Sequence, residues 1–155
     1  MATTLVLMRH AHACLDYDGE DFYCPLSTEG RIAQRRMNLI LKEHGYVPDL
    51  ILCSPFLRTK QTAELIAEAF GCPVEEEPLV GQEFDQTLLM QSLQEVPKNS
   101  TLFIVGHEPT LRSFIEALAG WGCLTEGLCR CGAVAFVFPA EVGFGLGKFS
   151  AYLKP

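Results

Sequence analysis

Short apolar runs with the composition of β-strands alternate along this chain with longer segments of helical period. This alternation limits the possible folds more than any other feature. Three of the runs predict buried strands, at Thr4–Met8, Leu50–Ser54 and Thr101–Val105. Each is followed, after a polar loop or turn, by a segment whose apolar residues recur every three or four positions. Strands that alternate with helices favour an α/β domain with a mostly parallel sheet.

Four helices are predicted between and after these strands. Ser27 offers a side-chain oxygen to cap a helix that begins near Thr28 and is ended by Gly45, and a second helix after Pro55 and Phe56 is closed by Gly71. The other two cover Gln86–Glu95 and Thr110–Leu118. The predicted inward residues are Ala33, Met37, Ile40, Leu41 and His44 in the first helix, Leu57, Leu65, Ile66, Ala69 and Phe70 in the second, Leu88, Leu89, Ser92 and Leu93 in the third, and Leu111, Phe114, Ile115 and Leu118 in the fourth.

The remaining runs complete the sheet. Val74–Glu77 fits a short edge strand, and Gly132–Phe138 and Lys148–Leu153 alternate like antiparallel strands. A chain of 155 residues fits one domain. We therefore predict a single domain over residues 1–155, a three-layer α/β/α sandwich whose mostly parallel central sheet has an antiparallel C-terminal edge.

Charge and composition exclude several classes of protein. The net charge of −7 argues against a broad surface for nucleic acid, because binding to the phosphate backbone depends on clustered Lys and Arg. No apolar run approaches the ~18 residues of a membrane-spanning helix, and no secretory signal is evident. Seven cysteines, an odd number, then indicate reduced thiols. We expect a cytoplasmic protein without membrane or nucleic-acid partners.

Polar residues follow the three buried strands at equivalent places: Arg9-His10 after the first, Ser54–Thr59 after the second and Gly106-His107 after the third. Ligands of open α/β sheets bind outside the carboxyl ends of the strands, so these residues are expected to converge. The planar guanidinium of Arg meets two phosphate oxygens at once and stays charged. Two arginines at one point predict an anion site.

Histidine adds a nucleophilic nitrogen to such a site. The ordinary pKa of a histidine side chain is ~6.5, and the neighbouring charges of Arg9 and Arg58 favour the neutral ring. A neutral His10 can attack a bound phosphorus and form phospho-His10, which water then hydrolyses. Arg9, Arg58 and His107 are expected to stabilise charge on the phosphoryl oxygens, and Ser54 is a further candidate for contact with substrate.

The same residues resemble the motifs of a known family. Four segments are similar, in order and spacing, to motifs of the histidine phosphatase (phosphoglycerate mutase-like) superfamily: Leu7–Ala11, Pro25–Ser27 with Gly30, Ser54–Thr59 with Gln61–Ala63, and Val105–Glu108. The nearest resemblance is to its small SixA-type phosphohistidine phosphatases, although Ala11 replaces the common Gly. The resemblance implies His10 as the nucleophile and Arg9, Arg58 and His107 as phosphate ligands, with no metal and no other cofactor.

The short interval between Arg58 and His107 indicates an open site, since relatives that act on small substrates carry longer insertions there. An open site suits phosphohistidine on a protein, such as a histidine-containing phosphotransfer domain, with inorganic phosphate as product. Imidazole also leaves without a strong general acid, whereas an alkoxide requires one. Glu83 and Asp85 occupy roughly the region where relatives that act on esters place their acid.

Two alternatives remain at this stage: a small phosphomonoester phosphatase that uses Glu83 or Asp85 as the acid, and a non-catalytic module that binds phosphate or phosphoproteins. The sequence leaves open whether Asp16, Asp18 or Asp21 reaches the site. A metal-dependent phosphatase is disfavoured because no Asp/Glu cluster lies near the strand ends. The spacing of Cys123, Cys129 and Cys131 fits no common zinc site. Residues 143–148 fail the phosphate-loop template, and His12 and His44 are assigned no chemistry.

Overall fold

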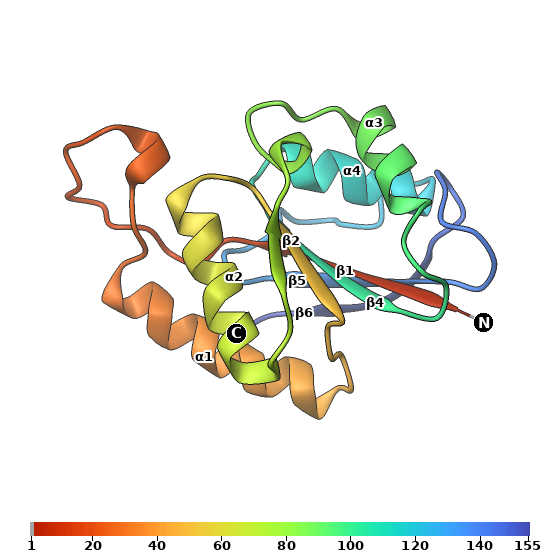
Figure 1. The fold of residues 1–155 in the computed structure, drawn as a ribbon, viewed down its shortest axis with the longest axis horizontal. Coiled ribbons are helices and arrows are strands. Elements are labelled where there is room, and N and C mark those ends of the chain that lie inside the picture. Colours follow the sequence, from red (N-terminus) through yellow and green to blue (C-terminus); the bar gives the residue numbers. More distant parts are fainter. Residues whose placement is uncertain (1) are drawn as a thin grey trace.

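A single six-stranded sheet organises the computed structural model, which describes residues 2–155 (Figure 1). The predicted domain began at Met1, which lies outside the described residues. The strands are β1 (Thr3–Arg9), β2 (Leu50–Cys53), β3 (Val74–Glu76), β4 (Thr101–Gly106), β5 (Ala133–Phe138) and β6 (Lys148–Leu153). They lie in the order β3-β2-β4-β1-β5-β6, with the first four parallel and β5 and β6 antiparallel. The predicted mixed sheet is confirmed.

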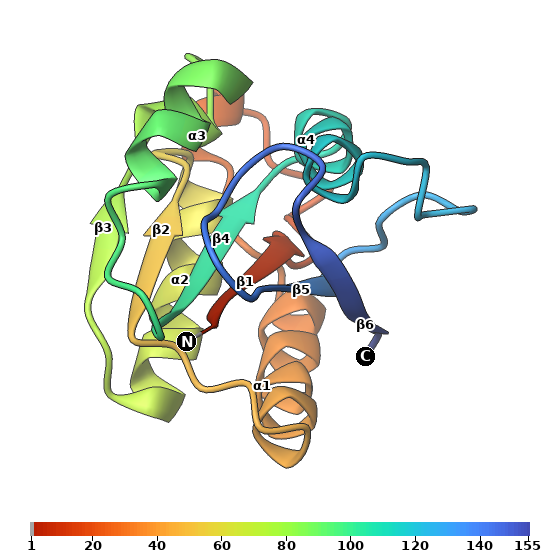
Figure 2. The same ribbon diagram turned by 90° about the vertical axis from the view of Figure 1, so that its right-hand side faces the viewer.

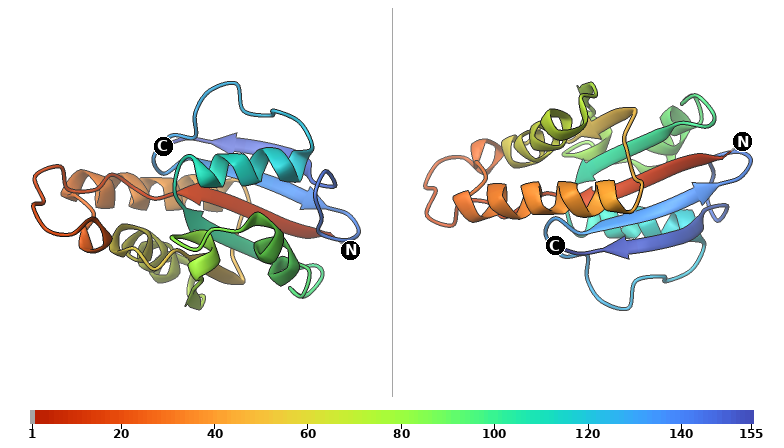
Figure 3. Two further views of the ribbon diagram at one scale, coloured as in Figure 1. Left: turned by 90° about the horizontal axis from the view of Figure 1, so that it is seen from above. Right: turned by 90° about the horizontal axis from the view of Figure 1, so that it is seen from below.

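Helices cover both faces of this sheet, as the views from above and below show (Figure 3). One face carries α1 (Thr28–Glu43) and α2 (Leu57–Phe70), and the other carries α3 (Gln86–Leu93) and α4 (Thr110–Ala119). Two short 3-10 helices, η1 (Asp21–Tyr23) and η2 (Pro78–Val80), lie in the connections. This is the predicted three-layer arrangement.

The four inner strands, β1, β2, β4 and β5, are buried on both faces, which is why their sequences are almost continuously apolar. In β1, Leu5 and Leu7 belong to one core cluster with Phe114 and Leu118 of α4. Val6 and Met8 point the other way. There they join a second cluster to which α1 contributes Met37 and Leu41 and α2 contributes Leu65 and Ile66. Figure 2 shows how α1 and α4 flank the β1–β5 part of the sheet.

The predicted inward faces of three helices need correction. In α3, Leu88 is 48% exposed and Ser92 is exposed, while Met90 is buried beside Leu89 and Leu93. The helix is only eight residues long, so its few apolar residues are compatible with more than one inward face, and packing of Leu89, Met90 and Leu93 into the core cluster decides between them. At the end of α1, His44 is exposed, and its Nδ1 donates to the carbonyl of Ile40 at 2.8 Å. In α2, the predicted inward residue Ala69 is likewise exposed.

Two polar side chains occupy the inward face of α1 instead. Gln34 and Asn38 are buried, and the Gln34 amide donates to Oδ1 of Asn38 at 2.9 Å. Asn38 in turn donates to the carbonyl of Leu65 in α2 at 3.1 Å. Because buried polar groups need partners, this pair links α1 to α2 by hydrogen bonds as well as by packing.

The start of α1 holds the segment that follows His10. Ser27 caps the helix as predicted, its hydroxyl oxygen accepting from the N–H of Gly30 at 3.0 Å. The carbonyl of His12 accepts the backbone N–H of Ser27 at 2.9 Å and lies directly against Gly30, where an added Cβ would approach the carbonyl oxygen to 2.2 Å. Gly30 is therefore required by the close approach of the segment after β1.

We expect Gly30→Ala to lower the free energy of unfolding by roughly 1–3 kcal/mol, because the new methyl group must push the His12 carbonyl away from α1. Urea unfolding followed by circular dichroism measures this change. Gly122→Ala is the matched control, since an added Cβ there meets no atom within 4 Å. Equal stability of the two variants would contradict the assignment.

Candidate active site

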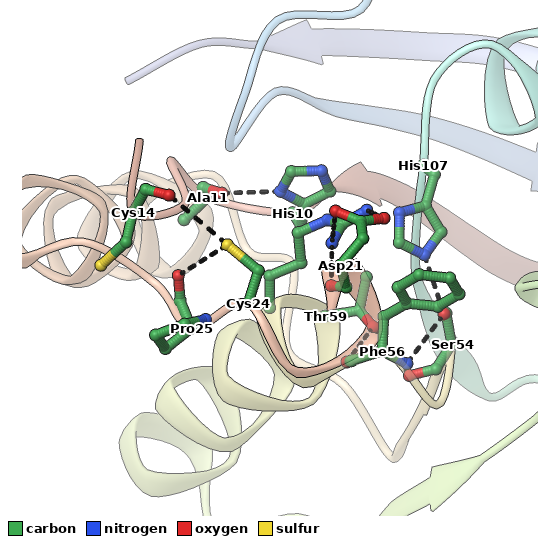
Figure 4. A network of polar contacts seen from close by, with 11 residues as sticks. His10, Ala11, Cys14, Asp21, Cys24, Pro25, Ser54, Phe56, Thr59 and His107 are labelled. Atoms are coloured by element: carbon green, nitrogen blue, oxygen red, sulfur yellow. Dashed lines mark hydrogen bonds and ion pairs between the residues drawn. The ribbon is translucent and has the colours of Figure 1, made fainter. Parts of the chain in front are cut away.

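Parallel pairing brings the ends of β1, β2 and β4 together, and the predicted site residues with them. Arg9 is the last residue of β1 and pairs with Gly106, the last residue of β4. The N–H of His10 donates to the Gly106 carbonyl at 3.1 Å, and the N–H of Ser54 donates to the Val105 carbonyl at 3.2 Å. Figure 4 shows the result: His10 and His107, nearly a hundred positions apart in the chain, lie side by side.

The His10 ring is held in one orientation. Its Nδ1 donates to the carbonyl of Ala11 at 2.7 Å, and the residue is 8% exposed. Burial lowers the pKa of His10 to about 3. The hydrogen bond to Ala11 opposes this shift, and the nearby His107, Arg58 and Arg9 add to it. Since Nδ1 carries the proton, the lone pair of the neutral ring is on Nε2. His10 therefore offers an uncharged nucleophilic nitrogen.

His107 is oriented by the predicted residue Ser54. The hydroxyl oxygen of Ser54 lies 2.8 Å from Nε2 of His107 and also accepts the N–H of Phe56 at 3.2 Å. The rings of His10 and His107 have centroids 5.4 Å apart, and Phe56 packs edge-on against His107 at 4.8 Å. Ser54 is fully buried, so the structure places its hydroxyl behind His107 rather than in the open site.

Burial also governs the charge of His107. Loss of hydration lowers its pKa to about 4, and Arg58 and Arg9 act in the same direction, whereas Asp21 opposes them. Both histidines are thus neutral near pH 7. The guanidinium groups of Arg9 and Arg58 then supply positive charge at the junction of the strands.

The two arginines have different partners. Arg9 donates from Nη1 to the carbonyl of Leu128 at 3.0 Å, while its buried Nε has no hydrogen-bond partner among residues 2–155. Arg58 forms a bidentate ion pair with Asp21, from Nη1 to Oδ1 at 3.1 Å and from Nη2 to Oδ2 at 3.2 Å. Its guanidinium carbon also lies 4.9 Å from the centroid of the Phe56 ring.

Two adjoining hollows open onto this cluster, and both are lined by Arg9, His10, Asp21 and Arg58. The first, of about 410 Å³, continues along the loop after β1 past Cys14, Leu15 and Tyr17 to Arg130. The second, of about 400 Å³, continues past His107, Gln82 and Glu108. The site is a surface depression wide enough for a phosphoryl group with its leaving group attached.

The predicted acids lie elsewhere. Glu83 is exposed and is absent from the lining of both hollows, where its neighbour Gln82 is found. Asp85 caps α3 by accepting the N–H groups of Thr87 and Leu88, each at 3.0 Å. The carboxylates that line the hollows are Asp21 and Glu108.

Sequence reasoning did not place Asp21, Glu108 or Arg130 in the site. Glu108 follows His107 directly, so its position next to a strand end was the available signal. Arg130 is brought in by the loop before β5, where Cys131 and Gly132 hydrogen-bond to the backbone of Arg9. Asp21 had been left open with Asp16 and Asp18, because a loop of this length has no periodic pattern.

No group of three or more His, Cys, Asp or Glu side chains within residues 2–155 is arranged to hold a metal ion. The seven cysteines, including Cys123, Cys129 and Cys131, are free thiols. None of the helices in the described part of the chain has the length and apolar character to cross a bilayer.

Comparison with known proteins gives concordant matches. The family model of the histidine phosphatase superfamily (branch 1) matches residues 5–82. An uncharacterized protein of Picosynechococcus sp. (strain PCC 7002) is 33% identical over 123 residues, covering 74% of this chain and 72% of that protein.

Solved structures share the whole fold. An Agrobacterium tumefaciens protein assigned as the phosphohistidine phosphatase SixA superposes with a TM-score of 0.82 at 26% identity, covering 99% of this chain and 98% of that one. The protein histidine phosphatase SixA complexed with tungstate superposes with a TM-score of 0.84 at 24% identity, covering 97% of this chain and 96% of that one. A phosphoserine phosphatase mutant from Entamoeba histolytica superposes with a TM-score of 0.73 at 16% identity, covering 97% of this chain and 96% of that one. The last two matches show a common fold.

We expect His10 and His107 to remain neutral down to about pH 5, because their pKa values of about 3 and about 4 lie below the ordinary value of 6.5. As the pH falls below about 6.5, each of these two histidines binds a proton in the unfolded chain but not in the folded chain. The free energy of unfolding should therefore decrease as the pH drops from about 6.5 toward 4. Nitrogen-15 NMR of the imidazoles should show neutral rings, with Nδ1 of His10 protonated. Midpoints near 6.5 would be incompatible with the buried geometry.

Proposed function

The chain belongs to the histidine phosphatase superfamily, and from that premise we propose that it is a metal-independent phosphatase that hydrolyses phosphohistidine on a protein through a phospho-His10 intermediate. The observation that carries the proposal is the His10 ring, which lies beside two guanidinium groups. Its Nδ1 donates to the Ala11 carbonyl, and its Nε2 has no hydrogen-bond partner among residues 2–155. A neutral nitrogen next to an anion site is what attack on phosphorus requires.

In the proposed reaction, Arg9, Arg58 and His107 bind the non-bridging oxygens of the phosphoryl group. Nε2 of His10 attacks the phosphorus, and the bond from phosphorus to the substrate nitrogen breaks as the imidazole leaves. Water then attacks phospho-His10, which releases inorganic phosphate and restores the free ring. The arginines stabilise charge on the oxygens while bonds change, which is the usual route by which phosphoryl transfer is accelerated.

The leaving group supports phosphohistidine over esters. An imidazole departs as a neutral or singly protonated ring, whereas an alkoxide must receive a proton as it leaves. Neither Glu83 nor Asp85 lines the hollows. A phosphohistidine substrate removes the need for either residue.

A phosphomonoester phosphatase is the second candidate, and one observation favours it. Glu108 lines the hollow that contains His10 and His107, and its Oε1 is buried without a hydrogen-bond partner in the described chain. A carboxyl group in that position would serve as the proton donor for an ester oxygen. A non-catalytic binding module is disfavoured because a free Nε2 on His10 serves attack better than binding.

We propose a phosphorylated protein, of the histidine-containing phosphotransfer type, as the partner. The loop after β1 presents apolar side chains at the rim of the site, with Leu15 84% exposed and Tyr17 37% exposed. Such side chains suit contact with a protein surface better than enclosure of a small molecule. The free thiols suit a reducing compartment, and a cytoplasmic location is part of the same proposal.

His10→Ala should lower phosphate release by at least roughly a thousandfold, because no other group replaces the attacking nitrogen. Reactions with a 32P-labelled substrate, quenched in alkaline denaturant because the P–N bond of phosphohistidine is labile in acid, should show the label on His10 of the wild-type protein and none on the variant. His44→Ala is the matched control, since His44 is an exposed helix cap. Full activity in His10→Ala would rule out the proposed intermediate.

We also expect a phosphorylated histidine phosphotransfer domain to be turned over faster than phosphomonoesters such as phosphoserine, measured as kcat/KM. Glu108→Gln should leave the phosphohistidine rate within a few-fold of wild type, because that leaving group needs no strong acid. Faster turnover of esters, lost in Glu108→Gln, would establish the second candidate instead.

A further inference from the structure

The carboxylate of Asp21 binds the face of Arg58 that a phosphoryl group would use. Its two oxygens meet the two terminal nitrogens of Arg58 at 3.1 and 3.2 Å. This is the paired geometry in which a guanidinium binds two oxygens of phosphate. Asp21 also lines both hollows together with His10 and Arg9. The loop after β1 thus places an anion of its own at the proposed phosphate subsite.

Electrostatics explains why Arg58 needs an anionic partner. The Arg58 side chain is only 14% exposed, and a charged group with so little access to water is costly without a counter-charge. Asp21 supplies that charge. A bound phosphoryl group would supply it as well, and the two anions repel each other at the same guanidinium, so they compete for it.

Asp21 can leave without moving the chain. Its side chain is 76% exposed, so a rotation about the Cα–Cβ bond carries the carboxylate into water. The backbone at Asp21 stays fixed, because its carbonyl accepts hydrogen bonds from Nη1 of Arg58 at 3.0 Å and from the N–H of Cys24 at 3.1 Å. The next residue, Phe22, packs on Phe56 with ring centroids 5.1 Å apart.

We propose that Asp21 is an internal competitor of the phosphoryl group for Arg58, displaced when substrate binds and returning as phosphate leaves. This inference rests on the proposed function only in taking Arg58 as a phosphate ligand. The competition weakens the binding of substrate and product alike. Its benefit is at the end of the cycle, where the returning carboxylate replaces inorganic phosphate on Arg58 and helps to release it.

The experiment is a calorimetric titration of the full chain with inorganic phosphate, which needs no turnover. Asp21→Asn and Asp21→Ala should lower the Kd for phosphate by roughly three- to tenfold, the range of a strong, partly exposed ion pair. Asp18→Asn is the matched control. It removes the same charge from the same loop, but Asp18 is exposed and does not line either hollow. Its Kd should change by less than roughly twofold.

The outcomes separate the two proposals. Weaker phosphate binding in the Asp21 variants would show that Asp21 positions Arg58. An equal gain in phosphate affinity in Asp18→Asn would show a general charge effect. Either result would overturn the proposed competition between Asp21 and phosphate. A gain confined to Asp21 supports it, even if His10→Ala were to retain activity and the proposed function were to fail. Absence of phosphate binding in the wild type and in all variants would overturn both proposals.

Discussion

The parallel register of β1, β2 and β4 is the constraint on which the rest of the site depends. Arg9 pairs with Gly106, and Cys53 with Val105, so the residues that follow each strand begin at one level. A slip of one position would exchange the two faces of a strand and turn its buried side chains toward the wrong cluster. Because both faces of these strands are buried against helices, both core clusters enforce the same register. Packing of the core thus positions His10.

Charge balance is the second requirement. Two arginines and two histidines within one depression would repel strongly if all four were protonated, and burial of the rings removes that conflict by keeping the histidines neutral. The Ala11 carbonyl fixes which nitrogen of His10 carries the proton, and the Ser54 hydroxyl holds His107. Asp21 offsets the charge of Arg58. The proposed nucleophile and the proposed anion site therefore depend on the same low accessibility to water.

The strands, the helix ends and the convergence of Arg9, His10 and His107 could be predicted because they follow from local period, capping residues and strand polarity. What escaped prediction depends on contacts distant in sequence. Asp21 and Arg130 lie in loops whose paths are set by bonds to Arg58 and to the backbone of Arg9. In the sequence, Gln34 and Asn38 have the polar character of a solvent-exposed helix face. Their burial follows from the hydrogen bond of Asn38 to the carbonyl of Leu65, which is distant in sequence. In the short helix α3, the apolar pattern fitted more than one inward face, and packing into the core decided between them.

An in-line reaction at phosphorus explains why an open depression suits the proposed chemistry. The attacking and leaving groups lie on opposite sides of the phosphorus, so the substrate imidazole departs on the side away from His10. Water must later approach phospho-His10 from that same side. The imidazole therefore has to leave before water can enter, and a closed pocket would need a lid to exchange them. Here two hollows that share Arg58, Asp21 and His10 in their lining are open to the surface, so in the proposed reaction the exchange would proceed by diffusion of the partner protein.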